Sequence, residues 1–139
     1  MPPMPLYMLD TDTVSYLVRG RTPALDAHVQ TVLPKHLCIS AVTRGELLYG
    51  LKLKNGANRL ARLIDQFLLR VRCLPWDEAA ATQFASIAAD LHKAGTPIGS
   101  MDAMIAGHAV AIGAVLVTNN SRHFSRVAGL SVENWSQEH

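Results

Sequence analysis

Short apolar segments alternate with helical segments along this chain, and this alternation limits the possible folds more than any other feature. Four short, mainly apolar segments are typical of strands buried on both faces of a sheet: Leu6–Leu9, Leu37–Ile39, Val71–Leu74 and Ala114–Val117. Ser131–Trp135 alternates in polarity and predicts a last strand at a sheet edge. Strands that alternate with helices predict an α/β fold, in which a central, mostly parallel sheet is flanked by helices on both faces.

The segments between these strands carry the signals of helices. Large apolar residues recur at three- and four-residue spacing over Asn58–Leu69, which predicts an amphipathic helix. Ser40 and Ser100 are good N-caps for two further helices. A long alanine-rich helix is predicted over about residues 77–93, and Gly95 closes it. A helical pattern also follows the first strand directly.

The composition predicts a single globular domain over residues 1–139. This length suffices for a substantial core, and 49% apolar against 17% charged residues is far from the range of disordered chains. Thirteen basic and eleven acidic side chains give a formal net charge of +2, which permits an anionic partner without requiring one. Cys38 and Cys73 predict reduced thiols rather than a disulfide or a metal site. Because the sequence has no run of about twenty apolar residues and no signal-peptide pattern, we expect a cytoplasmic protein.

Polar residues follow the predicted strands at the points where active sites of α/β proteins form. Asp10 comes directly after the first strand, and Glu46 lies about two turns into the helix after the second. Asp102 lies in the first turn of the helix that follows a Gly-Thr-Pro-Ile-Gly loop, and Thr118, Asn119 and Asn120 follow the fourth strand. Sites in open α/β sheets lie beyond the carboxyl ends of the parallel strands. We therefore expect these groups to gather at one edge of the sheet.

A cluster of carboxylates predicts a metal ion. Like charges that are held close together repel and raise each other's pKa values unless a cation lies between them. Oxygen ligands without histidine or cysteine select Mg²⁺, with Mn²⁺ as the alternative, over zinc. Such an ion acidifies bound water and stabilises charge on a phosphoryl oxygen. The residues therefore predict hydrolysis of a phosphate ester.

Each acidic residue also has a structural interpretation. Asp10 or Asp12 could cap the helix after the first strand, and Asp102 could interact favourably with the dipole of its own helix. Glu46 is harder to explain in this way, because the residues after it are apolar and a charge among them is costly without a partner. Taken together, the strand-end positions favour the functional interpretation.

Five motifs in order along the chain resemble those of a known family. They are MLDTD at residues 8–12, ISAVTRGELLYG at 39–50, GTPIGSMDAMIAGHA at 95–109, LVTNNSRHF at 116–124 and VAGLSVENW at 127–135. With these motifs the chain resembles the PIN-domain ribonucleases and, within them, the VapC-type toxins of bacterial toxin–antitoxin modules. The resemblance extends from about residue 6 to residue 135 and implies a single PIN-like domain.

The resemblance implies roles for individual residues. Asp10, Glu46 and Asp102 fall on the family's three acidic metal-site positions, where they would act in catalysis. Asn120 falls on the fourth polar position, although the neighbouring Asn119 could fill it instead. Asp12 stands where many relatives carry asparagine, and it could join the site or cap the helix. Thr11 and Thr118 are expected to orient the acids by hydrogen bonding, as neighbours of metal ligands commonly do.

The same resemblance implies a substrate and partners. It implies a Mg²⁺-dependent endoribonuclease that is inhibited by a VapB-like antitoxin and that assembles as a homodimer or a larger toxin–antitoxin complex. Residues 95–109 resemble most the branch of toxins that cut initiator tRNA in its anticodon stem-loop. Exposed arginines, of which Arg44, Arg122 and Arg126 flank the acidic motifs, could line an RNA groove or could simply be solvated.

Two questions stay open from the sequence. Two consecutive predicted helices carry many large apolar residues: Leu47, Leu48, Leu51, Leu60, Leu63, Phe67 and Leu68. These residues could form an interface with another copy of the chain or with an antitoxin, or they could belong to the ordinary hydrophobic core. Two other functions also remain. One is a different Mg²⁺ phosphohydrolase, which is disfavoured because no G-x-x-x-x-G-K-[ST] loop is present. The other is a nuclease-derived module that binds RNA without cutting it.

Overall fold

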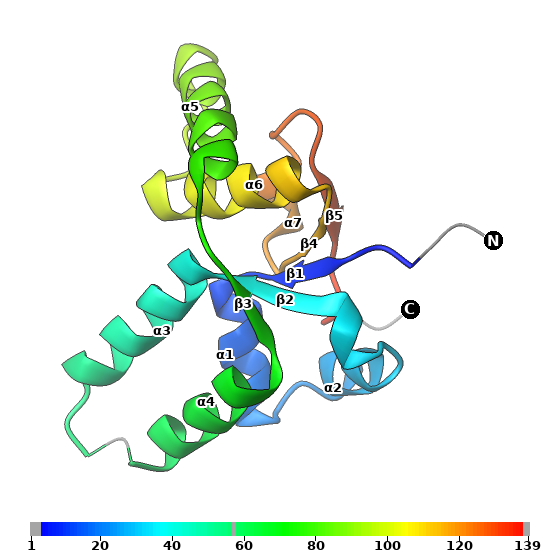
Figure 1. The fold of residues 1–139 in the computed structure, drawn as a ribbon, viewed down its shortest axis with the longest axis vertical. Coiled ribbons are helices and arrows are strands. Elements are labelled where there is room, and N and C mark those ends of the chain that lie inside the picture. The colour runs from blue at the N-terminus through cyan, green and yellow to red at the C-terminus, as the bar shows by residue number, and fades with distance from the viewer. Residues whose placement is uncertain (1–3, 57, 138–139) are drawn as a thin grey trace.

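Five parallel strands form the central sheet of this protein, which is seen here in a computed structural model that describes residues 4–56 and 58–137 (Figure 1). The strands are β1 (Tyr7–Leu9), β2 (Leu37–Ser40), β3 (Arg72–Leu74), β4 (Val115–Val117) and β5 (Ser131–Glu133). They lie in the order β3-β2-β1-β4-β5, and every neighbouring pair is parallel. The predicted α/β class is thereby confirmed, and β5 forms the expected edge.

Helices connect consecutive strands and cover the sheet on both faces (Figure 1). They are α1 (Thr11–Arg19), α2 (Pro23–Gln30), α3 (Ala41–Leu53), α4 (Asn58–Arg70), α5 (Glu78–Lys93), α6 (Ser100–Ile112) and α7 (Ser121–Phe124), and a 3₁₀ turn, η1, spans Pro34–His36. The sequence signals predicted α1, α3, α4, α5 and α6, with bounds within one or two residues for α4, α5 and α6, and did not predict the short α7. They missed α2, in which only Leu25 is fully buried, so that its sequence carries little apolar periodicity.

The pleat of the strands divides the core into two clusters. Met8, Cys38 and Leu116 lie on the face of the sheet that α5 and α6 cover, where they pack with Ile105 and Ala106 of α6. The next residue along each strand faces the other side, where Leu9, Ile39 and Val117 pack with α1, α2, α3 and α4. This alternation is the period of two that a sheet with two covered faces requires. Cys38 and Cys73 are free thiols, as predicted, and burial raises the pKa of Cys38 to about 12.

The apolar residues of α3 and α4 serve mainly as core. Leu47 is buried, and Leu51, Leu60, Phe67 and Leu68 pack against the same cluster. The larger apolar side chains that these two helices expose are instead Tyr49, Leu53 and Leu69, which are 66%, 66% and 87% exposed. Ordinary packing therefore accounts for most of the residues that had suggested an interface.

The start of α6 differs from the expectation. Gly99, with φ of 90°, occupies the N-cap position, and Ser100 is the first helical residue. The cap makes no side-chain hydrogen bond, so the prediction that Ser100 caps this helix is wrong. The reason is local: the backbone turns through a left-handed conformation that glycine adopts without strain, which moves the helix start one residue back. Ser40, in contrast, caps α3 as predicted, because its hydroxyl oxygen accepts a hydrogen bond from the amide of Val42.

Candidate active site at the carboxyl ends of the strands

Asp10 lies at the centre of the site, where β1 ends and α1 begins. Its side chain is 4% exposed, and Oδ1 accepts a hydrogen bond from the amide of Thr13 at 2.9 Å. Burial raises the pKa of the Asp10 carboxyl, and hydrogen bonds from Thr118 and Thr13 oppose this rise. Asp10 therefore caps α1 and also places a poorly solvated carboxylate beside the end of β4. The capping and functional interpretations of this residue are compatible.

Glu46 approaches Asp10 from α3 and is held by a threonine of α1. The hydroxyl of Thr11 donates a hydrogen bond to Glu46 Oε1 at 2.6 Å, and Thr11 Oγ1 lies 3.2 Å from Thr43 Oγ1. Thr43 is fully buried, whereas Glu46 is half-buried. Because Thr11 directly follows Asp10 in the chain, this contact brings the second carboxylate to the first. Thr11 thus has the geometry expected of a residue that orients an acid.

Asp102 completes the group of acids from the first turn of α6. Its side chain is 38% exposed. Burial is the main cause that raises the pKa of Asp102, and the negative charges of Asp10, Glu46 and Asp12 raise it further. His123 opposes these effects, with Nε2 at 3.3 Å from Asp102 Oδ2. Asp102 therefore lies close enough to Asp10 and Glu46 for their charges to affect its pKa, although the three acids come from separate parts of the chain.

The two asparagines after β4 have different surroundings. Asn119 Oδ1 accepts a short hydrogen bond from the hydroxyl of Ser136, which ties β4 to the segment after β5. Asn120 is exposed at the N-cap position of α7, where its side chain makes no capping bond. Its amide instead donates to Thr118 Oγ1 at 3.0 Å. The side chain of Asn120 is therefore more accessible than that of Asn119, which favours Asn120 for the fourth polar position of the site. This assignment stays a prediction.

The donor set of the site fits a hard divalent cation. Burial raises the pKa values of Asp10 and Asp102, and for Asp102 the charges of Asp10 and Glu46 add to this rise. A bound cation would relieve both effects, because it stabilises the ionised carboxylates. Within residues 4–56 and 58–137, no three acidic, histidine or cysteine side chains converge closely enough to form a finished metal site. The assignment of Asp10, Glu46 and Asp102 as ligands stays a prediction.

Two histidines near the site have tertiary contacts that sequence spacing cannot reveal. Buried His108, on α6, places Nδ1 at 2.8 Å from Oγ of Ser40, the residue that caps α3. This bond joins the helix of Asp102 to the start of the helix of Glu46. His123, on α7, contacts Asp102 directly. No histidine in the sequence stands at the spacing of metal ligands from another. The packing of α6 against β2 and α7 is what places His108 and His123 near the site.

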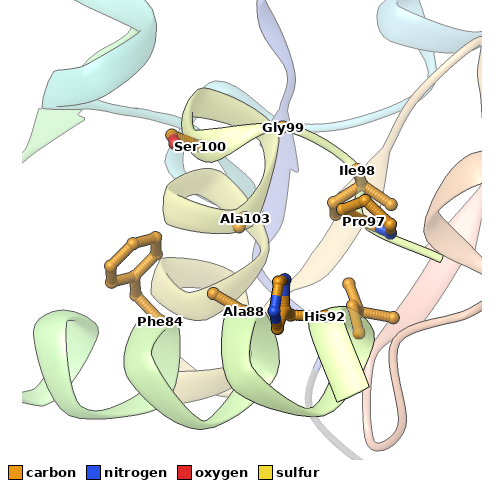
Figure 2. A pocket seen from close by; sticks show the side chains of 9 residues that line it. Phe84, Ala88, His92, Pro97, Ile98, Gly99, Ser100 and Ala103 are labelled. Carbon is orange, nitrogen blue, oxygen red and sulfur yellow. The ribbon is translucent and has the colours of Figure 1, made fainter. Parts of the chain in front are cut away.

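The surface around the acids is mainly apolar. A groove lined by Val42, Gly45, Tyr49, Met101 and Met104 opens beside Glu46. A second pocket lies between α5 and the start of α6 and contains none of the acids (Figure 2). Arg44, Arg122 and Arg126 are exposed, as both interpretations of these arginines require. No helix in the described parts of the chain combines the length and hydropathy that a bilayer crossing needs.

The fold agrees with comparisons to known proteins. The family model of the PIN domain matches residues 7–130, which is nearly the whole chain. The chain therefore belongs to the PIN-domain family. Nucleases of this family generally depend on a divalent metal ion, in keeping with the donor set described above.

Similar proteins define the branch of the family. A tRNA(fMet)-specific endonuclease VapC of Shigella flexneri is 39% identical over 130 residues, which cover 94% of this chain and 98% of that protein. The DNA-bound VapBC structure from Salmonella typhimurium has a TM-score of 0.87 at 36% identity and covers 95% of this chain and 99% of the other. VapBC2 from Rickettsia felis, bound to a DNA fragment from their promoter, has a TM-score of 0.86 at 30% identity, with coverages of 94% and 98%. Within its family, this chain is a nuclease of the VapC type.

Proposed function

We propose that this protein is the toxin of a toxin–antitoxin module and acts as a Mg²⁺-dependent endoribonuclease in the cytoplasm. The observation that carries the proposal is the placement of Asp10, Glu46 and Asp102 at one edge of the sheet. Burial raises the pKa of Asp102 there, and the charges of Asp10 and Glu46 raise it further. A structural role for all three would not require this costly arrangement. An enzyme that must hold a cation does require it.

In this proposal the three carboxylates hold the ion, and neighbouring hydroxyls hold the carboxylates. A bound Mg²⁺ acidifies a water molecule and stabilises charge on the phosphoryl oxygens of RNA. Thr11 fixes Glu46 through its 2.6 Å hydrogen bond, and Thr118 donates to Asp10. Asn120, exposed at the start of α7, is available to water or to the substrate. Oxygen ligands of this kind favour Mg²⁺ or Mn²⁺ over zinc.

The substrate that we propose is a structured RNA, in the first instance initiator tRNA cut in its anticodon stem-loop. Two similar curated proteins, from Shigella flexneri and Salmonella typhimurium, are named as endonucleases specific for tRNA(fMet). The apolar groove beside Glu46 also suits unpaired bases better than duplex phosphates. A net charge of +2 gives little non-specific attraction to RNA, so selectivity must come from the shape of the substrate.

The test combines cells and purified protein. After brief induction, sequencing of RNA 5′ ends should reveal one dominant break in the anticodon stem-loop of initiator tRNA. The purified protein should make the same cut with Mg²⁺ and none with EDTA, and Asp102→Asn should be inactive. Breaks spread over messenger RNA would refute the tRNA substrate but not the nuclease. Binding of tRNA by the Mg²⁺-loaded protein without any cut would point to a binding module.

We propose a VapB-like antitoxin as partner, in a homodimeric or larger complex. The solved VapBC structures from Salmonella typhimurium and Rickettsia felis pair a VapC with its VapB. Tyr49, Leu53 and Leu69 remain exposed on α3 and α4 and offer apolar surface for such contacts. Expression of the chain alone should arrest bacterial growth, and co-expression of the cognate antitoxin should restore it. Harmless expression of folded, metal-competent protein would contradict the toxin proposal.

A further inference from the structure

The first turn of α6, which carries Asp102, has little support of its own. Gly99 caps this helix without a side-chain hydrogen bond. A pocket of about 170 Å³ lies between this turn and α5, and the residues that begin the helix, from Pro97 to Ser100, line it together with Phe84 and Ala88 (Figure 2). The turn is therefore neither capped from within nor fully packed on the side of α5. Ile98 and Ala103 anchor the backbone here in the core, and the ion-pair contact of the Asp102 carboxylate comes from another element.

His123 supplies that contact from α7. Its Nε2 atom lies 2.9 Å from the carbonyl oxygen of Ile98 and 3.3 Å from Oδ2 of Asp102. A carbonyl oxygen can only accept a hydrogen bond, so Nε2 must carry a hydrogen. The N–H group therefore donates to the residue before the N-cap of α6, and the same ring nitrogen lies at ion-pair distance from the acid in the first turn of that helix. This requirement holds for the neutral and for the charged ring alike.

The helix that carries His123 is itself well anchored. Phe124, the next residue, is 1% exposed, and its ring meets the His123 ring edge to face at 5.6 Å. The amide of His123 donates to the carbonyl oxygen of Asn120 at 3.1 Å. α7 is therefore a fixed support, and the imidazole extends from it toward the less supported start of α6.

We propose that His123 is a positioning residue for the nuclease reaction: its Nε2–H donates to the Ile98 carbonyl and so fixes the start of α6, and the same nitrogen lies at ion-pair distance from Oδ2 of Asp102, which leaves Oδ1 available for a divalent ion or its water. The inference rests on the proposed function, because it assigns Asp102 to the metal site. It adds a residue from a fourth helix to that site. It also predicts that the hydrogen-bond donor at Nε2, rather than the aromatic ring, is what the site needs.

Two amide substitutions separate the donor from the ring. The side-chain nitrogen of glutamine reaches the position of histidine Nε2, whereas that of asparagine reaches only the position of Nδ1. Mn²⁺ affinity, measured by calorimetry without RNA, should fall about 10- to 100-fold in His123→Asn and stay within about threefold of the parent in His123→Gln. At saturating Mn²⁺, His123→Asn should lower kcat for tRNA cleavage and leave KM nearly unchanged.

Controls make the outcomes decisive. Ser125→Ala removes another hydrogen bond of the α7 region, from the Ser125 hydroxyl to the Arg122 carbonyl oxygen, and should leave Mn²⁺ affinity unchanged. Thermal unfolding of each metal-free variant shows whether any loss reflects stability alone. Equal Mn²⁺ affinity in the parent, His123→Asn and His123→Gln would overturn the inference, while cleavage by the parent would leave the proposed function standing. Absence of Mn²⁺ binding in the parent would overturn both.

Discussion

The carboxyl groups of Asp10 and Asp102 lie where an ionised side chain destabilises the metal-free protein. Burial is the first cause that raises the pKa of each group, and for Asp102 the neighbouring acids add to it. A raised folded-state pKa contributes stability that is complete below the unfolded pKa of about 4 and is lost as the pH rises through the folded value. A bound cation reverses this loss, because it stabilises the ionised form.

The first prediction follows for Asp10→Asn and Asp102→Asn. Each should lower Mg²⁺-dependent cleavage by about 100-fold or more. Without metal, each variant should be as stable as the parent or slightly more stable at pH 7, and its melting temperature should fall less than that of the parent as the pH rises above about 4. Melting curves with EDTA from pH 4 to pH 8, run beside cleavage assays, measure both effects. Parental cleavage by either variant would refute the assignment of the site.

The second prediction concerns the buried imidazole of His108, for which stability changes with pH in the direction opposite to that for Asp10 and Asp102. Burial lowers the pKa of His108, and the charge of Asp77 opposes this only in part. Because the unfolded chain then binds the extra proton more readily, stability should fall as the pH drops below about 6.5. His108→Asn can keep the contact with Ser40 but cannot titrate. It should lose about 1–3 kcal/mol from poorer packing, and its melting temperature should vary less between pH 6.5 and pH 5 than that of the parent.

Among single residues, the sequence can predict those whose role follows from the residue type and its position after a strand. Asp10, Glu46 and Asp102 could be identified because acids after buried strands are costly, and the structure brings all three together. His123 and Thr43 could not be identified. A histidine 21 positions after Asp102 carries no local pattern, and its contact depends on where α7 packs. Whether the acids bind a metal is a matter for experiment.

At the scale of elements, α5 and α6 pack closely against each other at Gly107. A Cβ atom at Gly107 would lie 2.6 Å from the backbone nitrogen and 2.8 Å from the Cα of Phe84. These atoms belong to the backbone of α5 and cannot rotate away. Glycine at 107 therefore sets how closely the helix of Asp102 packs against its neighbour, although glycine within a helix is intrinsically unfavourable.

The third prediction compares two glycine substitutions of the same kind. Gly107→Ala should destabilise the protein by about 1–3 kcal/mol, because the two helices must move apart. Gly50→Ala is the matched control: it also lies within a helix, and its added Cβ would meet no atom within 4 Å. It should stabilise the protein by about 0.5–1 kcal/mol through helix propensity. Urea denaturation measures both, and a shift of the same sign in the two variants would contradict the packing argument.

The accuracy of the predicted elements depended on how much of each one the core demands. Helices with one strongly apolar face, such as α4, and strands buried on both faces were located to within one or two residues. α2 was missed because it buries little apolar surface, and its first turn is marked only by Pro23. The N-cap of α6 was misplaced because Ser100 has the right side chain, whereas the left-handed backbone at Gly99 decides the start.

At the scale of the whole molecule, the small net charge limits how RNA can be held. The formal charge is +2, and the arginines that flank the acidic motifs number three. The fourth prediction is therefore a shallow salt dependence: the log of RNA affinity against the log of salt concentration should have a slope no steeper than about −2 to −3. Filter binding of tRNA to Asp102→Asn at KCl concentrations from about 50 to about 300 mM measures it. A slope near −6 would mean that an unrecognised basic surface binds the backbone.

The position of β1 in the sheet has a consequence for protein synthesis. β1 pairs with β2 on one side and with β4 on the other, and β4 begins only at Val115. A ribosome that adds about 5–20 residues per second exposes Asp10 and Glu46 several seconds before Asp102. Until then the first strand lacks a neighbour, and the group of acids lacks its third member. The site is therefore incomplete in the growing chain, and any activity that depends on all three acids arises only when the last third of the polypeptide has been made and folded.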